Sequence, residues 1–323
     1  GYVTRFKTIH NYDPTMKLIV TGGCGFIGSH FIDYVHNLGH EIIIIDNLST
    51  GKKENIESLI KSDKIKLFVE DIQNFDALNS IIDNADAVIH FAGSTGVIES
   101  LEKPQEFTEI NVIGTLNLLQ ICRNKKIPKF VFASTGAVYG NQSPPFKEQM
   151  NTNPISPYAA SKVACEQYCI TYKNTFDISC SILRFSNVFG PRKSFGPYAN
   201  VIPKFVRSIL RNESITIYGD GEQERDFVYV KDVARACFLA LSKNNNGIFN
   251  IATGKNTTVN YLISKIEFLL KKKFTKVFVS SRPGESKFAY SSIEKAKMDF
   301  SYIPEYSLEQ GLLEYIEYEK QLL

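Results

Sequence analysis

Two residues four positions apart, Tyr158 and Lys162, have the clearest capacity for acid–base chemistry in this sequence. Ser156 suits a helix N-cap and Pro157 the first helical position, so both side chains lie on one face of a predicted helix. A tyrosine has an ordinary pKa of about 10, and a nearby ammonium group favours its phenolate form. The pair is therefore a candidate for removing a proton from a hydroxyl group, although such a pair alone is more often a surface contact.

A glycine-rich turn lies far upstream, in Thr21-Gly22-Gly23-Cys24-Gly25-Phe26-Ile27-Gly28. It follows a predicted strand and opens a predicted helix, where glycines permit a tight turn and the free N–H groups attract a pyrophosphate. Asp46 lies 18 residues beyond Gly28, at the end of the next predicted strand. A carboxylate there accepts hydrogen bonds from ribose hydroxyls and repels a 2′-phosphate, so NAD is favoured over NADP.

The elements that position these residues alternate between short apolar strands and helices. Strands are predicted at 17–21, 41–45, 65–69, 86–90, 129–134 and 180–184, and helices at 26–38, 107–124 and 158–174. Uniformly apolar strands are typical of sheets that are buried on both faces. The pattern predicts an α/β fold, a doubly wound parallel sheet of the Rossmann type.

The chain changes character after residue 187, where prolines and glycines precede mixed helices and short strands. We expect a second, smaller α/β lobe there, and 247–252 again has the composition of a buried strand. The predicted division is an NAD-binding domain at 16–187 plus about 227–255, and a substrate-binding domain at 188–226 plus about 256–323. Residues 1–15 precede Met16 and are interpreted as an extension or a cloning remnant.

Composition excludes several classes of protein. The 323 residues have a net charge of +3 and 43% hydrophobic residues, which indicates an ordinary globular protein and argues against nucleic-acid binding. No stretch is apolar enough to span a bilayer and no secretory signal pattern is present, so we expect no membrane partner and a cytoplasmic location. The six scattered cysteines predict buried thiols and no metal site.

The ordered motifs TGGCGFIGSH, DNLSTG, FAG, FASTGAVYG, SPYAASK, LRFSNVFGPR and RDFVYVKDV resemble the extended short-chain dehydrogenase/reductase family, in its NAD-dependent nucleotide-sugar epimerase/dehydratase branch. The similarity covers residues 16–323 and implies that Tyr158 is the acid/base. It implies that Lys162 binds the nicotinamide ribose and lowers the tyrosine pKa. Thr135 would hydrogen-bond the reacting sugar oxygen, with Ser134 as the substitute.

The same resemblance implies the cofactor-binding residues. Gly22, Gly25, Phe26 and Ile27 would form the turn that binds the pyrophosphate, and Asp46 and Asn47 would contact the adenosine ribose. Asp71 and Ile72 would lie beside the adenine, and Phe91, Ala92 and Gly93 beside the nicotinamide half. Asp71 has a helix cap as an alternative role, and Asn111 has a structural one.

For the substrate, the resemblance implies a second set of residues. Asn187 would hold the nucleotide sugar, and Asn200 and Val201 the diphosphate or the uracil. Arg225 and Arg282 would hold the diphosphate, and Tyr218 the uracil. Ala289, seven positions after Arg282, is a small residue that would admit a 2-acetamido group. The Asp–Glu pair of sugar dehydratases is replaced by Gly136 and Ala137, which cannot transfer protons.

The resemblance thus implies a UDP-sugar 4-epimerase acting on UDP-N-acetylglucosamine and UDP-N-acetylgalactosamine, with UDP-glucose and UDP-galactose as a second pair. One alternative is a UDP-glucuronate 4-epimerase or decarboxylase, for which Ser94, Thr95 and Ser100 offer hydroxyls to the C6 carboxylate. A second is a reductase of 4-keto sugars, which Asp46 disfavours because such enzymes usually use NADPH. A third, from a different class, is an NAD-sensing regulatory protein. A homodimer is implied, joined through helices 107–124 and 158–174 with outward Leu116, Ile121, Cys165 and Tyr168.

Overall fold

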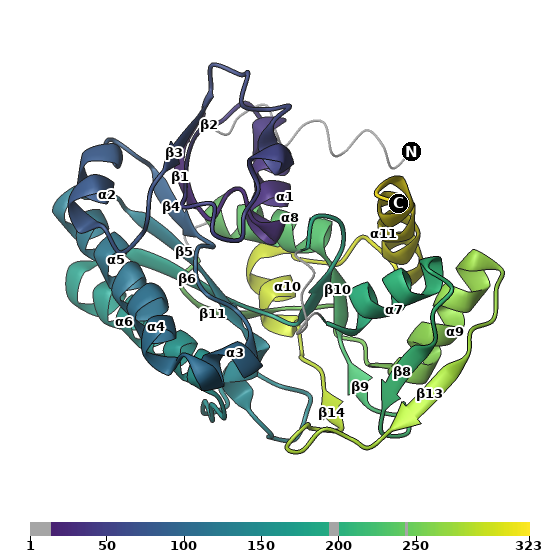
Figure 1. Cartoon of the computed structure of the whole chain (residues 1–323). Coiled ribbons are helices and arrows are strands. Elements are labelled where there is room, and N and C mark those ends of the chain that lie inside the picture. The colour runs from purple at the N-terminus through teal and green to yellow at the C-terminus, as the bar shows by residue number, and fades with distance from the viewer. Residues whose placement is uncertain (1–13, 194–199, 243–244) are drawn as a thin grey trace.

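The computed structural model describes residues 14–193, 200–242 and 245–323. Figure 1 shows a central sheet with helices on both faces, beside a second group of short strands and helices. The sheet has seven parallel strands in the order β11-β6-β5-β4-β1-β2-β3. Their bounds are β1 Lys17–Thr21, β2 Glu41–Asp46, β3 Ile65–Val69, β4 Ala87–His90, β5 Lys129–Thr135, β6 Ser179–Phe185 and β11 Gly247–Ile251.

Alternate residues of each central strand pack on opposite faces of the sheet. In β1, Leu18 and Val20 belong to the hydrophobic cluster beneath α1 and α8, whereas Ile19 belongs to the cluster beneath α2, α5 and α6. Both faces are therefore buried, which confirms the doubly wound α/β fold. The helices along this part of the chain are α1 Phe26–His36, α2 Phe75–Ile81, α3 Val97–Glu102, α4 Pro104–Thr108, α5 Gly114–Asn124, α6 Pro157–Phe176 and α8 Val230–Ser242, with short 3-10 turns η1 Lys53–Ile56 and η3 Gly136–Tyr139.

Strand β1 lies between β4 and β2, so the direction of winding reverses between β1 and β4. In doubly wound sheets, ligands bind outside the carboxyl ends of the strands at this switch point. The glycine-rich turn follows β1, Phe91 follows β4, and Thr135 ends β5. The topology therefore brings three of the predicted motifs to one edge of the sheet.

The helix predicted at 107–124 is not a single regular helix, which corrects the sequence-based expectation. A π-helical segment, η2 Glu109–Ile113, separates α4 from α5. Asn111 lies inside this segment, and its carbonyl accepts hydrogen bonds from the Thr115 hydroxyl at 2.6 Å and the Cys165 thiol at 3.1 Å. These side chains replace part of the regular backbone ladder, and sequence periodicity does not show such a change.

The second group of elements is built from small sheets and four helices. The strand pairings are β7 with β10, β8 with β13, and β9 with both β12 and β14. The bounds are β7 Asn187–Phe189, β8 Ile215–Tyr218, β9 Glu224–Arg225, β10 Phe227–Tyr229, β12 Thr257–Thr258, β13 Lys276–Val279, β14 Phe288–Ala289, α7 Val201–Leu210, α9 Val259–Leu270, α10 Glu294–Phe300 and α11 Leu308–Gln321. β11 returns to the main sheet, but the boundaries of the two predicted domains stay a prediction.

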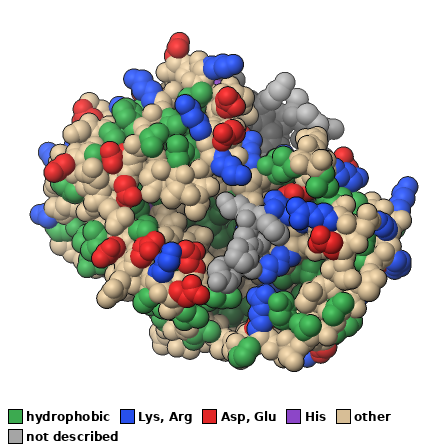
Figure 2. Space-filling view, in the orientation of Figure 1, with side chains coloured by type: hydrophobic (Ala, Val, Ile, Leu, Met, Phe, Trp, Pro, Cys, Tyr) green, Lys and Arg blue, Asp and Glu red, His purple; other side chains and the backbone are tan. Residues whose placement is uncertain are grey.

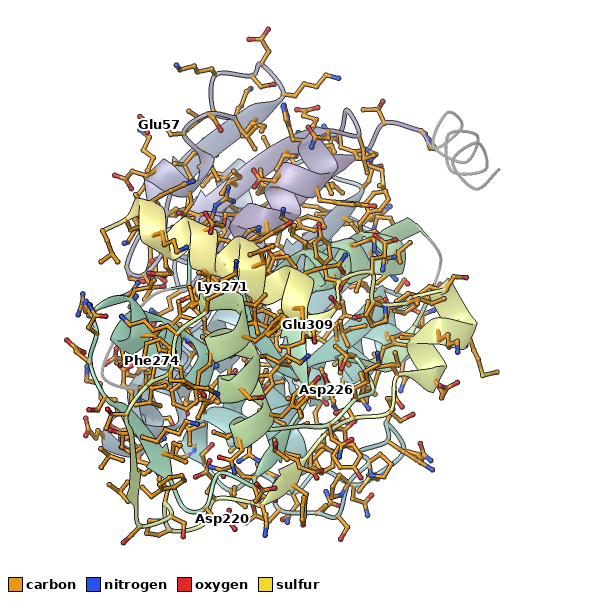
Figure 3. The ribbon with its side chains drawn as sticks, turned by 90° about the vertical axis from the view of Figure 1, so that its right-hand side faces the viewer. Glu57, Asp220, Asp226, Lys271, Phe274 and Glu309 are labelled. Carbon is orange, nitrogen blue, oxygen red and sulfur yellow. The ribbon has the colours of Figure 1, made fainter. Side chains whose placement is uncertain are left out.

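A buried carboxylate connects this second group to the end of β11. Asp226, labelled in Figure 3, accepts hydrogen bonds from the Thr253 amide and hydroxyl at 2.9 and 2.7 Å and from the Gly254 amide at 2.9 Å. Its own carbonyl accepts from the Asn187 amide at 3.1 Å. Burial raises the pKa of Asp226 to about 6, against these hydrogen bonds. Asp226 thus connects β7, through its backbone carbonyl, with the loop after β11, through its carboxylate.

The structure also tests the predictions about the cysteines, the outward-facing residues and membrane-spanning segments. Six free cysteines are present and all are buried, as predicted. Ile121 and Cys165 are fully buried in the core, so the expectation that they face outward is wrong, whereas Tyr168 is 37% exposed. No helix in the described part of the chain is long and apolar enough to cross a bilayer. Thirteen of the fifteen residues interpreted as an extension, 1–13, lie outside the described residues.

Candidate active site

Helix α6 begins as the sequence predicts and delivers the tyrosine and lysine to the end of β5. The Ser156 hydroxyl accepts a hydrogen bond from the Ala159 amide at 3.1 Å, and Pro157 is the first helical residue. Thr135, the last residue of β5, accepts a hydrogen bond from the Ala137 amide at 3.1 Å and is hydrogen-bonded through its side chain to Tyr158. Sheet and helix thus bring the two hydroxyl groups together.

The pKa of Tyr158 is governed by its surroundings. Burial raises this pKa to about 12, and the hydrogen bond with Thr135 opposes the rise. Because a hydrogen bond that lowers an acid's pKa stabilises its ionised form, the Thr135 hydroxyl acts as donor toward the phenolate. The ring also packs edge-on against Phe107, with centroids 6.4 Å apart. Ring and hydroxyl are therefore both fixed in orientation.

Lys162 lies one turn further along the same helix and is almost fully buried. Its ammonium group donates to the Ala133 carbonyl at 3.0 Å and lies 4.9 Å from the centre of the Phe132 ring. Burial lowers the pKa of Lys162, against an opposing effect from Glu166 and two cysteines. The groups that shift the Tyr158 pKa do not include Lys162. The predicted lowering of the tyrosine pKa by this lysine stays a prediction.

Ser134, the alternative to Thr135, is bound elsewhere. Its hydroxyl donates to Glu166 at 2.5 Å, and Glu166 is paired with Arg184 through contacts of 2.6 and 3.1 Å. All three residues are buried. This network fixes α6 against β5 and β6 and occupies the Ser134 hydroxyl, so Thr135 stays the candidate for the hydroxyl that contacts the sugar.

The glycine-rich turn packs tightly against the loop after β4 and against its own helix, which only glycine permits. Gly22 has φ +69°, and a Cβ there would lie 2.7 Å from the Ala92 amide nitrogen. A Cβ on Gly28 would lie 2.1 Å from the Gly22 carbonyl oxygen, so this glycine sets the distance between helix and strand. Gly25 is the N-cap of α1, and no side chain caps the helix. Its first N–H groups are therefore available to an anion.

Asp46 lies at the end of β2 and is 7% exposed. Its carboxylate accepts hydrogen bonds from the Cys24 amide at 3.0 Å and the Leu48 amide at 2.9 Å. The residue therefore shapes the glycine-rich turn as well as the loop after β2, beyond the predicted contact with ribose. Its lone pairs are enough for further hydrogen bonds, since a carboxylate accepts about four.

Asn47 and Asp71 meet across the carboxyl ends of β2 and β3, where the Asn47 amide donates to the Asp71 carboxylate at 3.1 Å. Asp71 is not the cap of α2, because Asn74 has that role, with its side chain accepting from Ala77 at 3.2 Å. Ile72 is buried against Gly114 of α5. Packing accounts for the Ile72 side chain, and contact with adenine stays a prediction.

A buried hydrogen-bonded chain beneath the loop Phe91–Gly93 was not anticipated from the sequence. His90 contacts the Thr21 hydroxyl at 2.6 Å through Nδ1 and the Thr115 hydroxyl at 2.9 Å through Nε2. Thr115 donates to the Asn111 carbonyl, so His90 Nε2 carries the proton and Nδ1 accepts from Thr21. The signal in the sequence was a polar residue at the end of an apolar strand.

Asn111 has the structural role that was considered for it. Its side-chain oxygen accepts from the Ser94 amide at 2.7 Å, and its amide group donates to the Ser94 carbonyl and the Ser161 hydroxyl, both at 3.0 Å. A Cβ on Gly93 would lie 2.9 Å from the same side-chain oxygen. Asn111 therefore holds the loop after β4 against α6.

On the substrate side, the structure brings Asn187 and Asn200 together in the lining of one small pocket, with Phe227 between their elements. Asn200 is the N-cap residue of α7, and its side chain makes no capping hydrogen bond to that helix. Val201, the first residue of α7, is half-buried. That these residues contact a substrate stays a prediction.

The aromatic and basic residues predicted for the nucleotide form two groups. The Arg282 guanidinium lies 4.1 Å from the centre of the Tyr218 ring, and a hydrogen bond from Arg282 lowers the pKa of Tyr218. Arg225 pairs with Glu285 at 3.0 Å and donates to its own neighbour's carbonyl. Lys204 of α7 adds another positive charge beside Arg282, although the sequence did not single it out.

Ala289 lies next to Arg225 in register, on the neighbouring strand β14. It packs against a small hydrophobic cluster of Val138, Tyr139 and Phe146, together with Val163 of α6. Val138 follows Thr135 by three residues and Val163 follows Lys162 directly. A larger side chain at 289 would therefore act close to the catalytic candidates.

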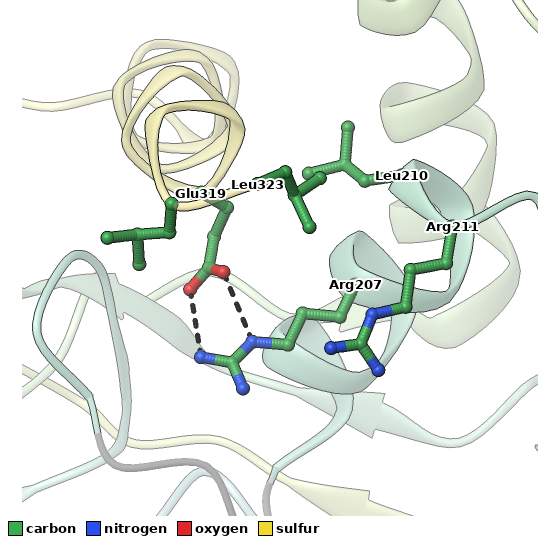
Figure 4. Close-up of a pocket in the computed structure, with 6 residues that line it drawn as sticks. Arg207, Leu210, Arg211, Glu319 and Leu323 are labelled. Atoms are coloured by element: carbon green, nitrogen blue, oxygen red, sulfur yellow. Dashed lines mark hydrogen bonds and ion pairs between the residues drawn. The ribbon is translucent and has the colours of Figure 1, made fainter.

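Charge on the surface is distributed unevenly around this region. Figure 2 shows Lys and Arg side chains gathered along the second-lobe margin of the hollow between the two groups of elements. A positive margin favours a phosphorylated ligand. A separate pocket between α7 and α11 (Figure 4) contains none of the predicted site residues, and its Arg207 pairs with Glu319 at 3.1 Å; its lining is Arg207, Leu210, Arg211, Glu319, Leu322 and Leu323.

A seven-stranded Rossmann sheet, a glycine-rich turn at its switch point and a Thr–Tyr–Lys group beyond β5 define a dinucleotide-binding enzyme of the short-chain dehydrogenase/reductase type. The chain belongs to the NAD dependent epimerase/dehydratase family, whose model matches residues 18–252. This match confirms the predicted family, an enzyme and NAD as its cofactor. The regulatory, non-enzymatic alternative is therefore not supported.

Individual relatives span almost the whole chain. A putative UDP-glucose 4-epimerase from Methanocaldococcus jannaschii is 40% identical and covers 91% of this chain and 95% of its own length. The structure of a UDP-N-acetylglucosamine 4-epimerase from Methanobrevibacter ruminantium, in complex with UDP-N-acetylmuramic acid, has a TM-score of 0.91, 37% identity and coverage of 96% and 100%. A UDP-glucuronic acid 4-epimerase from Bacillus cereus, solved with UDP-glucuronic acid and NAD, has a TM-score of 0.87, 34% identity and coverage of 95% and 100%.

Proposed function

We propose that this protein is a UDP-sugar 4-epimerase that interconverts UDP-N-acetylglucosamine and UDP-N-acetylgalactosamine, with UDP-glucose and UDP-galactose as a second substrate pair. The observation that carries the proposal is that Thr135 at the end of β5 meets Tyr158 and Lys162 of α6 at the carboxyl edge of the sheet, where Thr135 lowers the pKa of Tyr158 and Lys162 donates to the Ala133 carbonyl at 3.0 Å. Relatives named as 4-epimerases of UDP-sugars support the reaction class.

In the proposed reaction, Tyr158 takes the proton of the sugar 4-hydroxyl and Thr135 holds the same oxygen. Bound NAD would supply the hydride acceptor and donor for C4, so that the sugar passes through a 4-keto form and regains its hydrogen on the opposite face. Tyr158 then gives its proton back to the sugar oxygen, so the reaction consumes no oxidant or reductant. Lys162 is proposed to bind the nicotinamide ribose, and the glycine-rich turn the pyrophosphate.

Dehydration is disfavoured by the residues after Thr135. Gly136 and Ala137 are partly exposed at the site edge, and neither side chain can donate or accept a proton. Loss of water from C6 needs an acid and a base there. The protein is therefore proposed to return the hydride to C4.

The choice of acetamido sugars rests on Ala289. Its side chain is a single methyl group that packs against the cluster containing Val138, and we propose that this small side chain leaves room for the acetamido group. The relative named as a UDP-N-acetylglucosamine 4-epimerase supports this choice.

The second candidate, a UDP-glucuronate 4-epimerase, is favoured by the B. cereus relative. Of the three hydroxyls considered for a C6 carboxylate, Ser100 is fully buried and donates to the Val97 carbonyl at 2.6 Å. It cannot serve this purpose without breaking that bond. Ser94 is fixed through its backbone by Asn111, and only Thr95 is exposed.

The experiment incubates the protein with UDP-N-acetylglucosamine, without added NAD, and follows the anomeric proton signals by NMR. Formation of UDP-N-acetylgalactosamine, abolished in Tyr158→Phe, is the expected result. Turnover of UDP-glucuronate alone would favour the second candidate. No turnover of these sugars or of UDP-glucose by NAD-loaded protein would contradict the proposal.

We also propose a homodimer, formed through α3, η2 and α6. Apolar residues exposed on these elements are Val97, Ile98, Leu101, Ile113 and Tyr168, with exposed fractions from 37% to 60%. Such a cluster is typical of an interaction surface. Sedimentation of Leu101→Glu together with Ile113→Glu should show a monomer if this surface joins two copies, whereas an unchanged dimer would place the interface elsewhere.

A further inference from the structure

Lys193 is a lysine whose charge is not neutralised by a carboxylate among the described residues. Its ammonium group donates to the Val188 carbonyl at 2.9 Å and lies 5.3 Å from the centre of the Phe26 ring. Burial lowers the pKa of Lys193 to about 8, with no opposing carboxylate. The neighbouring Arg192, in contrast, pairs with Asp33 at 2.7 Å. A cation in this environment is stabilised by a nearby anion.

The backbone around Lys193 is held against α1. The His30 ring contacts the Pro191 carbonyl at 2.9 Å through Nε2, and burial lowers the pKa of His30 to about 4. The imidazole is thus neutral near pH 7 and donates this hydrogen bond. Together with the ion pair between Arg192 and Asp33, it fixes the segment that leaves β7 along the first helix. Lys193 therefore has a defined position relative to Phe26.

Phe26 is the first residue of α1 and directly follows Gly25, the last glycine before the helix, whose N-terminus no side chain caps. The first turn of this helix contains no acidic residue. Gly22, Gly25, Phe26 and Ile27 are partly exposed, whereas Gly23 and Cys24 are buried. The free N–H groups and the helix dipole attract an anion to this point, and a lysine beside it adds a full positive charge.

We propose that Lys193 is a further ligand of the cofactor's pyrophosphate and neutralises part of its charge. The inference rests on the NAD cofactor of the family and does not depend on which sugar is converted. A diphosphate is also present in UDP-sugars, and Val188 belongs to the pocket that contains Asn187 and Asn200. The contact with Phe26, which opens the pyrophosphate turn, favours the dinucleotide.

The test compares Lys193→Gln, which removes the charge but keeps an N–H donor for the Val188 carbonyl, with Lys193→Arg, which keeps the charge. The matched control is Lys295→Gln. Lys295 likewise donates to a carbonyl, that of Ile248 at 2.7 Å, and lies 4.6 Å from the Phe249 ring centre. Nucleotide-free protein is titrated by calorimetry with NAD, ADP-ribose, adenosine and UDP.

We expect Lys193→Gln to lower the affinity for NAD and for ADP-ribose by about tenfold or more, which is the usual effect of losing a hydrogen bond to a charged group. Adenosine and UDP should bind as in the unmodified protein, Lys193→Arg should recover most of the affinity, and Lys295→Gln should change none of them. Unchanged NAD affinity would overturn the proposal. Equal weakening of NAD and adenosine would also overturn it, as a sign of general distortion, and weakening of UDP alone would assign the lysine to the substrate.

Discussion

The hydroxyl of Thr135 is hydrogen-bonded to the phenol of Tyr158 while it accepts the amide of Ala137 at 3.1 Å. A hydroxyl has one proton, so the accepted amide leaves that proton free for the tyrosine oxygen. Burial alone would hold Tyr158 in its protonated form, and the threonine opposes this effect. The last residue of a strand thus adjusts the acidity of a residue on a helix 23 positions further along the chain.

Replacing Thr135 by valine should slow the reaction and shift its dependence on pH. Without the hydroxyl, the effect that lowers the pKa of Tyr158 is lost, so this pKa rises and the fraction of phenolate falls. We expect kcat to drop about a hundredfold, within the usual range for general base catalysis, and the rising limb of the pH–rate profile to move to higher pH. Thr135→Ser should recover both, and Thr108→Val, at an exposed threonine of α4, should change neither. An unshifted profile would contradict this coupling.

Replacing Ala289 by tyrosine should change the preference among sugars. The larger ring enters the space beside Val138 and Val163, where it competes with a 2-acetamido group. The ratio of kcat/KM for UDP-N-acetylglucosamine to that for UDP-glucose should fall about tenfold or more. Phe288→Tyr, on the exposed neighbour in β14, is the control and should leave the ratio unchanged. If Ala289→Tyr leaves it unchanged too, position 289 does not border the sugar.

Replacing Asp46 by asparagine should reduce discrimination against NADP. The negative charge that repels a 2′-phosphate is lost, and so is one acceptor for the Cys24 and Leu48 amides. We expect the ratio of the affinity for NAD to that for NADP to fall about tenfold. The free energy of unfolding should also fall by about 1 kcal/mol, because a hydrogen bond is lost. Asp86→Asn is the control, because Asp86 accepts from the Lys17 amide at 2.7 Å at the opposite end of β1. A retained NAD preference in Asp46→Asn would show that another group selects the cofactor.

Acid should destabilise the fold through His90. Burial lowers the pKa of His90 to about 3, and Lys162 acts in the same direction, whereas the unfolded chain takes up the proton near pH 6.5. The contribution of His90 to stability is therefore complete above pH 6.5 and is lost as the pH falls toward about 3, with a slope of up to about 1.4 kcal/mol per pH unit.

His90→Gln is the variant that tests this contribution, because an amide keeps an acceptor for Thr21 and a donor for Thr115. The free energy of unfolding, measured with urea between pH 4 and 7, should depend less on pH in this variant. His30, whose pKa is also lowered, is present in both proteins and cancels in the comparison. Parallel pH curves would exclude His90 as a source of acid sensitivity.

The sequence by itself determined the fold class and the motifs that carry the chemistry. Seven apolar runs predicted the strands, and the glycine-rich turn, Asp46 and the Tyr158–Lys162 pair each lie within a short contiguous stretch. Such features depend on local periodicity and on the special geometry of glycine and proline, which a sequence displays directly. The order of these motifs was also enough to predict the family, which the family model confirms.

Only the tertiary structure decided which polar side chains are free to act. Thr135 and Ser134 are adjacent hydroxyl residues, but Ser134 is bound to Glu166, 32 positions away, and Thr135 faces Tyr158. The π-helical segment around Asn111 and the burial of Ile121 likewise depend on distant partners. The physical reason is that a buried polar group must find a hydrogen-bond partner, and that partner is fixed by contacts between segments far apart in the chain.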